Sequence, residues 1–290
     1  MNRKKLFCFG MGKVALQLSL KLIEEGWNVY GTCRSEERRK ILESKGLKVK
    51  NFFPDKKIPD ISEELLNSSH VLISIPPNSN GCLVIKWYER EICNLLNSTW
   101  LGYISSTSVY GHHGENWVDE LTNPSPKTKM GINRLISENQ WRLVCKKNSI
   151  NLQIFRPGGI YSAMSNQIER FRNSSIHEPI IKDNIKFNRI HQDDLVGVIL
   201  SSFKHNNESN IFNVVDDKPA STWEQAQFVC EILSLNLPEN TKLDTATLSE
   251  KQKEFYKEMK LVKNDLIKKK LGYKLLYPSY KDGFRSILGL

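Results

Sequence analysis

The chain has 290 residues, of which 26% are charged and 39% hydrophobic, and 42 Lys and Arg residues against 32 Asp and Glu residues give it a net charge of +10. This composition excludes a disordered chain, and the sequence has no stretch of about 18 apolar residues that would cross a membrane. The positive charge favours anionic ligands such as nucleotides, but basic charge alone is weak evidence for a nucleic-acid partner, and we do not expect one.

The six cysteines indicate a reducing environment. They include no C-x-x-C pair, and their spacing suits neither a zinc site nor a disulfide framework. We therefore expect no metal site and a cytoplasmic protein. The basic residues before the first apolar run resemble the start of a signal peptide, but that run is broken at residues 10–13, too early for a secretory signal.

The first predicted elements are a buried strand at residues 5–9 and a helix at residues 14–23, joined by a glycine-rich turn. With Ala15, the turn has the form Gly-x-Gly-x-x-Ala, a variant of the dinucleotide-binding fingerprint. Its first glycine permits a tight turn, and its second lets the backbone approach a pyrophosphate at the helix N-terminus. The alternative is a turn whose glycines serve geometry alone. The residues expected at the phosphates are Gly10, Met11, Gly12, Lys13 and Val14.

The end of the second predicted strand, residues 28–33, bears on the choice of nucleotide. An acid at this place binds the ribose 2′-hydroxyl of NAD, whereas here Arg34 and Ser35 follow the strand. A guanidinium matches the charge and geometry of a 2′-phosphate, and Arg38 and Arg39 lie one turn further on. The sequence therefore favours NADP over NAD. The alternative is that these arginines only face solvent at the start of the following helix.

Strands and helices continue to alternate along the chain. Strands are predicted at residues 49–53, 71–75, 100–105 and 151–155, and helices at residues 61–66, 83–96 and 127–147. This alternation predicts an α/β fold, a Rossmann doubly wound parallel sheet with a smaller C-terminal substrate-side lobe. Ligands bind beyond the carboxyl ends of such strands, so Ile75, Pro76 and Pro77 are expected to line the adenosine side.

The C-terminal part has a looser pattern. We expect residues 1–161 to form the NAD(P)-binding domain, and residues 162–290 to be a mixed α/β part that contributes to the Rossmann core and to the substrate lobe. Strands are predicted at 185–190 and 211–215, a helix at 193–203, a helix opened by a capping box from Thr222 to Gln225, and one exposed, highly charged helix at 249–270.

Four stretches carry a resemblance to a known family. They are Gly10-Met11-Gly12, Ser105 to Gly111, Arg156 to Tyr161, and Arg189 to Leu195, and together they span most of the chain. In this order they resemble the short-chain dehydrogenase/reductase superfamily, in its extended and atypical branches. Within it, they resemble the NAD-dependent epimerase/dehydratase type, which includes the nucleoside-diphosphate-sugar epimerases.

The resemblance implies an active site with a hydroxyl, a tyrosine and a lysine. Ser106 matches the hydroxyl position, with Thr107 beside it, whereas Met130 and Arg134 stand at the Tyr and Lys positions of the Tyr-x-x-x-Lys motif. Met cannot transfer a proton, although Arg134 keeps a positive charge for a ribose or phosphate. Other candidate acids, for each of which packing or a surface role is favoured, are Tyr161, Tyr110, His112, His113 and His191. The resemblance places the nicotinamide end near Ser105, Pro157, Gly158, Gly159 and Ile160.

Three functions follow, in order of preference. The first is an NADP-dependent oxidoreductase or epimerase-like enzyme acting on a small carbonyl or hydroxyl compound or a sugar nucleotide, as the glycine turn, Arg34 and Ser106 indicate. The second is a non-catalytic NADP-binding sensor or scaffold, as Met130 and Arg134 indicate. The third is a member that binds RNA or another polyanion, for which the charge of +10 is the argument. The oligomeric state is open between a monomer and a homodimer.

Overall fold

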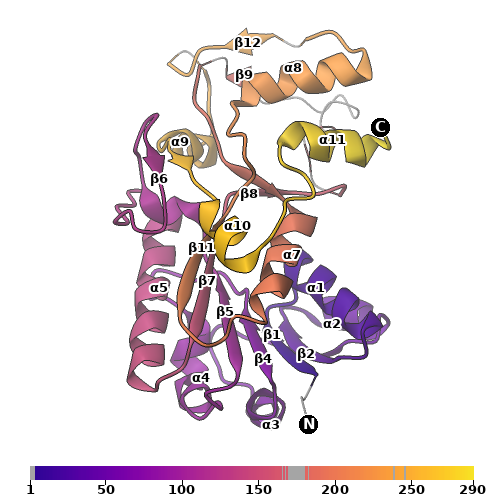
Figure 1. The fold of residues 1–290 in the computed structure, drawn as a ribbon, viewed down its shortest axis with the longest axis vertical. Helices are drawn as coiled ribbons and strands as arrows, with labels where there is room; N and C mark the ends of the chain where they lie inside the picture. Colours follow the sequence, from indigo (N-terminus) through magenta and orange to yellow (C-terminus); the bar gives the residue numbers. More distant parts are fainter. Residues whose placement is uncertain are drawn as a thin grey trace. The chain divides into compact units, whose positions relative to one another are not determined.

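The computed structural model describes residues 4–290 apart from residues 165, 167, 169–179, 182, 238 and 245. Within these residues, the centre of the fold is a seven-stranded sheet in the order β11-β7-β5-β4-β1-β2-β3 (Figure 1). Its strands are β1 (Lys5–Phe9), β2 (Asn28–Cys33), β3 (Lys48–Asn51), β4 (His70–Ile73), β5 (Trp100–Ile104), β7 (Leu152–Pro157) and β11 (Asn210–Val214). Every pairing from β3 across to β7 is parallel. This order confirms the predicted doubly wound sheet, because the chain runs outward from β1 to β3 and then returns to β4.

Helices cover both faces of the sheet. On one face, Phe7 and Phe9 of β1 join a core formed with α3 (Ser62–Leu66), α4 (Leu83–Cys93) and α5 (Lys129–Lys147). Cys8, between them, points to the opposite face, where Ser19 of α1 (Lys13–Glu24) contacts it. Every residue of β5 is buried, which explains why this strand reads as a nearly continuous apolar run. The other crossover helices are α2 (Glu36–Glu43), a 3-10 turn η1 (Pro59–Ile61) and α7 (Gln192–Ser202).

The chain divides into two compact units, each built from three segments. Unit 1 consists of Met1–Ser106, Ile132–Arg156 and Val196–Phe212, and unit 2 consists of Thr107–Gly131, Pro157–Leu195 and Asn213–Leu290. Unit 1 has 22 Lys and Arg residues against 13 Asp and Glu residues, whereas unit 2 has 20 against 19. The positive charge of the molecule therefore lies almost entirely in unit 1.

Unit 2 contains short strands and helices around a smaller apolar core. Its elements are η2 (Thr107–Tyr110), β6 (Trp117–Val118), β8 (Gly159–Tyr161), β9 (Ile180–Ile181), β10 (Arg189–His191), α8 (Thr222–Leu233), β12 (Asn240–Thr241), α9 (Glu250–Tyr256), β13 (Leu261–Val262), α10 (Asp265–Leu271) and α11 (Tyr280–Leu288). The strands form parallel pairs, β10 with β8, β12 with β9, and β13 with β6. The core includes Tyr161, Phe228, Tyr280 and Phe284.

Two elements of this part were predicted with the wrong boundaries. The capping box of α8 begins one residue earlier than expected, because the Ser221 hydroxyl accepts from Glu224 N at 3.1 Å and the Glu224 carboxylate accepts from Ser221 N at 2.7 Å. The strand expected at residues 185–190 is present only as β10, since Phe187 instead forms an isolated bridge with Ala220.

The prediction of one exposed helix at residues 249–270 was also wrong. The segment forms α9, then β13, then α10. Glu258, Met259 and Lys260 between α9 and β13 are buried, because they contact the loops of unit 2 rather than solvent. The charge of this segment therefore did not indicate its exposure.

No described helix combines the length and the apolar content that a bilayer crossing requires.

Candidate functional site

The point where the strand order reverses lies between β1 and β4, and the predicted glycine turn follows β1 at this point. The carboxyl ends of two neighbouring strands meet here, which is the usual place for a ligand in a doubly wound sheet. Ser74, directly after β4, donates its backbone N–H to Phe9 O at 2.9 Å, and its hydroxyl donates to Gly10 O. The two chain segments after β1 and β4 are thus bonded to each other.

Gly10 is required by the geometry of the turn. Its φ is +92°, and a Cβ there would lie 2.8 Å from Ile75 Cγ1. Both facts exclude other residues, since side chains disfavour positive φ and the space is occupied. Gly10 N donates to the Thr32 hydroxyl at 2.9 Å, which fixes the turn against β2.

Met11 turns its side chain into the protein. It is 4% exposed, the Ser19 hydroxyl donates to its Sδ at 3.3 Å, and its Cε fills the space where Gly31 has no side chain. Its backbone N–H donates to Thr32 O at 2.7 Å. Of the five residues expected at the phosphates, Met11 therefore serves to hold the turn.

Gly12 differs from Gly10 in every respect. Its φ of −75° and ψ of −173° are open to any residue, and a Cβ there would meet no protein atom within 4 Å. It is the N-cap of α1, no side chain caps the helix, and the first turn contains no acid. Lys13 is exposed and Val14 half-buried in that first turn, whereas Ala15 is buried. The N–H groups of a first helical turn have no acceptor within the helix, and together with the positive end of the helix dipole they suit an anion.

Arg34 and Ser35 are both exposed beyond β2. Ser35 is the N-cap of α2, and its hydroxyl accepts from Arg38 N at 3.2 Å. The guanidinium of Arg39 is paired with Glu36 and with Glu43 in the same helix. Of the three arginines expected near a 2′-phosphate, Arg39 is thus already engaged.

The loop after β4 carries the residues expected on the adenosine side. Ile75 is buried, Pro76 is exposed and Pro77 is half-buried. The loop is held by Gln140 of α5, whose amide oxygen accepts from Cys82 N at 2.8 Å and whose amide nitrogen donates to Asn80 O at 3.1 Å. Gln140 could not be identified from a local sequence pattern, because its partners lie about sixty residues away along the chain.

Ser105, which was expected near the nicotinamide end, is buried. Its hydroxyl donates to Glu138 Oε1 at 2.5 Å, and Arg156 donates to the same carboxylate at 3.0 and 2.6 Å. All three side chains are buried. Glu138 of α5 thus ties together the ends of β5 and β7, a role that sequence reasoning missed.

Arg134 lies at the carboxyl end of β5. Its guanidinium donates to Ile104 O at 2.6 Å and reaches the Tyr103 hydroxyl at 3.4 Å. Ser106, two residues after Ile104, is half-buried at the end of this segment of unit 1. In unit 2, Met130 is 62% exposed.

Tyr161 lies inside the core of unit 2. Its hydroxyl faces Gly283, where a Cβ would lie 2.2 Å away, and its ring packs edge-on against His191 and Phe284. Burial, with Asp216 nearby, raises the pKa of Tyr161 well above its ordinary value. Its catalytic role stays a prediction, and its surroundings favour packing.

The remaining predicted residues of unit 2 follow η2 and β7. Thr107 is buried in η2. After Pro157, which is buried, Gly158 N donates to Val214 O at 3.1 Å and Gly159 N donates to Asn188 O at 2.9 Å. Ile160 is 39% exposed. The backbone of this stretch is therefore fixed by unit 2 itself.

The other candidate acids have structural partners. The Tyr110 hydroxyl donates to Asn213 Oδ1 at 2.7 Å, and His112 Nδ1 accepts from Met259 N at 3.0 Å. His113 Nε2 lies 3.0 Å from Tyr110 O. In the His191 stretch, Asp194 accepts from Leu276 N at 2.7 Å, which ties the C-terminal segment to it. These contacts agree with the packing roles favoured from the sequence.

Two other features bear on where a ligand binds. Among the described residues, no cluster of His, Cys, Asp or Glu suits a metal ion. A cavity of about 300 Å³ in unit 1 is lined by Phe7, Tyr30, Leu47, Val49 and Ile61, among others. None of the predicted site residues lines it.

Comparisons with known proteins complete the description. A conserved protein of unknown function from Silicibacter pomeroyi DSS is 32% identical, with 98% of each chain covered and a TM-score of 0.90. A protein assigned as an NAD-dependent epimerase/dehydratase, from Methylobacillus flagellatus, is 21% identical, with 100% of this chain and 98% of that chain covered and a TM-score of 0.70. UDP-glucuronic acid 4-epimerase from Bacillus cereus, in complex with UDP-glucuronic acid and NAD, is 16% identical, with 98% of each chain covered and a TM-score of 0.74. No protein-family model matches the sequence, and no curated protein matches it either.

Proposed function

The chain belongs to the family of the conserved Silicibacter pomeroyi protein and has the fold of NAD-dependent epimerase/dehydratases, and we propose that it binds NADP. The proposed site is the edge of unit 1 where β1, β2 and β4 end. The proposed activity is that of an oxidoreductase or epimerase-like enzyme. Its substrate class is a small carbonyl or hydroxyl compound or a sugar nucleotide.

Gly12 is the observation that carries this proposal. Nothing in the fold requires a glycine there, because the backbone conformation is unrestricted and a Cβ would point into open space. A glycine without a structural reason, at the uncapped start of a helix and at the reversal of strand order, suits a site where a pyrophosphate approaches the backbone. The net positive charge of unit 1 further favours an anionic ligand.

The preference for NADP rests on Arg34. The solved neighbour from Bacillus cereus is in complex with NAD, and an NAD site uses an acid after β2 to bind the ribose 2′-hydroxyl. In this chain Arg34 occupies that place and is exposed. Its planar guanidinium suits a 2′-phosphate in both charge and shape.

The proposed chemistry assigns separate roles to this chain's residues. NADP, when bound, supplies or accepts a hydride. Ser106 and Thr107 are proposed to donate hydrogen bonds to the reacting carbonyl or hydroxyl oxygen. Arg134, fixed by Ile104 O, would hold a ribose or phosphate by its charge. Met130 takes no part in proton transfer, so the acid of the reaction is a group other than the one at the Tyr position.

A second candidate function is a non-catalytic NADP-binding sensor or scaffold. It is favoured by Met130, whose exposed thioether replaces the family's proton donor, and by Arg134, whose guanidinium is already bonded to the end of β5. The two functions differ in one measurable respect. An oxidoreductase oxidises NADPH with some carbonyl substrate, and an epimerase-like enzyme interconverts two sugar nucleotides without a net change in the cofactor, whereas a sensor binds NADPH and converts no substrate.

The first experiment is a titration of the purified protein with NADPH and with NADH, followed by Trp fluorescence. We expect tighter binding of NADPH, and Arg34→Ala should weaken NADPH binding by about 10- to 100-fold through the loss of a charge-assisted hydrogen bond. NADH binding should change little, because NADH has no 2′-phosphate.

The control for this experiment is Arg142→Ala. Arg142 is an exposed arginine of α5 in the same unit, so its removal changes the net charge equally without touching the proposed site. No binding of either nucleotide by the unaltered protein would overturn the proposed cofactor site.

A further inference from the structure

Two acids lie close to the place where an NAD site would have its acid. Glu36 and Glu37 form the first turn of α2, directly after Arg34 and Ser35. A free carboxylate here would accept a hydrogen bond from the 2′-hydroxyl of NAD, and it would repel the 2′-phosphate of NADP. The surroundings of Glu36 therefore bear directly on the choice between the two nucleotides.

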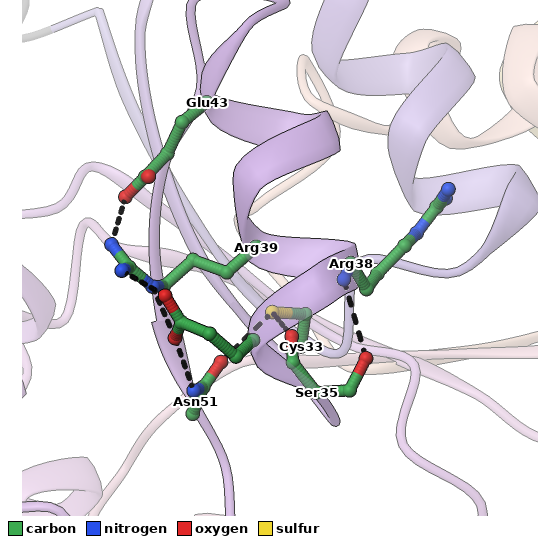
Figure 2. Close-up of polar contacts among 7 residues, drawn as sticks. Cys33, Ser35, Arg38, Arg39, Glu43 and Asn51 are labelled. Atoms are coloured by element: carbon green, nitrogen blue, oxygen red, sulfur yellow. Dashed lines mark hydrogen bonds and ion pairs between the residues drawn. The ribbon is translucent and has the colours of Figure 1, made fainter.

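Both oxygens of the Glu36 carboxylate are occupied. Oε2 accepts from Arg39 Nε at 2.9 Å and from Asn51 Nδ2 at 3.0 Å, and Oε1 accepts from Arg39 Nη2. The third arm of the guanidinium, Arg39 Nη1, donates to Glu43 Oε1 at 2.7 Å (Figure 2). Hydrogen bonds from Arg39, and after them from Asn51, lower the pKa of Glu36 to about 2.

Asn51 anchors this network to the sheet. It is the last residue of β3 and lies opposite Cys33, the last residue of β2. The Cys33 thiol donates to Asn51 Oδ1 at 3.5 Å, while the amide nitrogen of Asn51 serves Glu36. One side chain thus links the ends of two strands to the first turn of α2.

The side chain of Arg38, the residue before Arg39 in α2, points in a different direction from that of Arg39. Figure 2 shows the side chains of Arg38 and Arg39 on opposite sides of α2. Arg39 serves the Glu36 and Glu43 carboxylates, while Arg38 contributes its backbone N–H to the Ser35 cap. Near the end of β2, the negative charge of Glu36 is therefore paired with Arg39, whereas the positive charge of Arg34 is exposed to solvent.

We propose that Arg39 and Asn51 are specificity-determining positioning residues, which hold the Glu36 carboxylate toward β3 and so keep it from the 2′ position of the bound nucleotide. This inference rests on the proposed NADP site. It explains how a helix that begins with Glu36 is compatible with a 2′-phosphate, since the charge of this carboxylate is compensated by the Arg39 guanidinium.

The exposure of the network separates binding from folding. The side chains of Arg39, Glu36 and Glu43 are 33%, 52% and 40% exposed, and ion pairs that exposed contribute little to stability. Substitutions in the network should therefore leave the protein folded, so that a changed nucleotide preference reports on the site itself.

The test measures dissociation constants of NADPH and NADH for four forms of the full-length protein. Arg39→Met frees the Glu36 carboxylate and should shift the ratio of the two affinities about tenfold toward NADH, through repulsion of the 2′-phosphate. Adding Glu36→Gln to Arg39→Met should restore the original ratio, because the amide carries no charge. Lys45→Met, an exposed lysine just beyond α2, is the matched control for the lost positive charge.

The outcomes separate this inference from the proposed cofactor. If the unaltered protein prefers NADPH but Arg39→Met leaves the ratio unchanged, the inference alone is overturned. If Arg39→Met shifts the ratio and Glu36→Gln does not restore it, Arg39 binds the phosphate itself and the inference is again overturned. If the unaltered protein has no preference for NADPH, the cofactor proposal and the inference both fail.

Discussion

Gly10 and Gly12 lie in one turn, yet their surroundings differ. Gly10 has a positive φ, and a Cβ there would clash with Ile75. Gly12 has an ordinary conformation and open space around it. The fold therefore explains the first glycine, and it is the second for which we propose a ligand.

Gly12→Ser is the sharpest test of this difference. Serine is a preferred N-cap, so the free energy of unfolding should stay within about 1 kcal/mol of the original value. The added side chain would occupy the space of the pyrophosphate and compete for the same N–H groups, so NADPH binding should weaken at least about tenfold. Chemical denaturation and a fluorescence titration measure the two effects.

Gly10→Ala is the comparison for this prediction. It should lower the free energy of unfolding by about 1–3 kcal/mol, because alanine at φ +92° is strained. Unchanged NADPH binding by Gly12→Ser would mean that the glycine pattern is structural in this chain.

At the scale of single residues, the sequence allowed site residues to be proposed next to the chain's own motifs, but their distant partners were missed. Gly12 and Arg34 were identified because a fingerprint and a strand end mark them. Gln140, Glu138 and Asn51 were not, since each acts on residues between 15 and 60 positions away. Such contacts depend on how helices return to the sheet, which no local pattern records.

At the scale of elements, the start of α5 depends on a segment far along the chain. Glu258 Oε1 accepts from Lys127 N at 2.9 Å and from Thr128 N at 3.1 Å, just before α5 begins at Lys129. Lys260 Nζ donates to Glu258 Oε2 at 3.3 Å and to Gly111 O at 2.9 Å. A buried Glu–Lys pair thus caps the turn that presents Met130.

Glu258→Ala should destabilise the protein strongly. It leaves two backbone N–H groups without their acceptor and the Lys260 ammonium buried without its counter-charge, which costs about 3–5 kcal/mol. Glu254→Ala is the control, because its pair with Lys257 is exposed and should contribute at most about 1 kcal/mol. Urea denaturation of both variants measures the difference, and equal effects would contradict the assigned role of the buried pair.

This capping contact also explains why the prediction for residues 249–270 was wrong. A run of Lys and Glu residues usually indicates a solvated helix face. The same residue types can also be buried when each charge has an opposite charge beside it, as Glu258 and Lys260 do. By contrast, β1 and β2 were predicted with their observed bounds, because short apolar strands between turns carry a strong local signal.

At the scale of the whole molecule, strand alternation was enough to predict the doubly wound sheet, but not how the chain is shared between its units. Each unit is built from three separate segments, and four of the five passages of the chain between the units lie inside an element, namely α5, β7, α7 or β11. A helix that continues from one unit into the other keeps an unbroken helical sequence pattern, so the sequence does not show where the boundary lies. The concentration of positive charge in unit 1 could not be predicted for the same reason, because the unit is assembled from separate segments.

The stability of the molecule should depend on pH through His70, at the start of β4. Its ring packs against Trp27, Trp100 and Phe203 of the same unit, and Ser69 Oγ lies 2.9 Å from its Nδ1. Burial lowers the pKa of His70 to about 4, whereas a histidine in an unfolded chain has a pKa of about 6.5. Between these values the unfolded chain binds more protons than the folded one.

The free energy of unfolding should therefore fall as the pH falls from about 6.5 toward 4, with His70 contributing a loss of about 2 kcal/mol between pH 7.5 and pH 5. His70→Phe keeps an aromatic ring among Trp27, Trp100 and Phe203 and removes this titration. Denaturation of both proteins across this pH range isolates the contribution, because all other groups titrate alike in the two. A pH dependence that is the same with and without the imidazole would show that His70 is protonated in the folded molecule as readily as in the unfolded chain, and that the aromatic cluster at the start of β4 tolerates a charge.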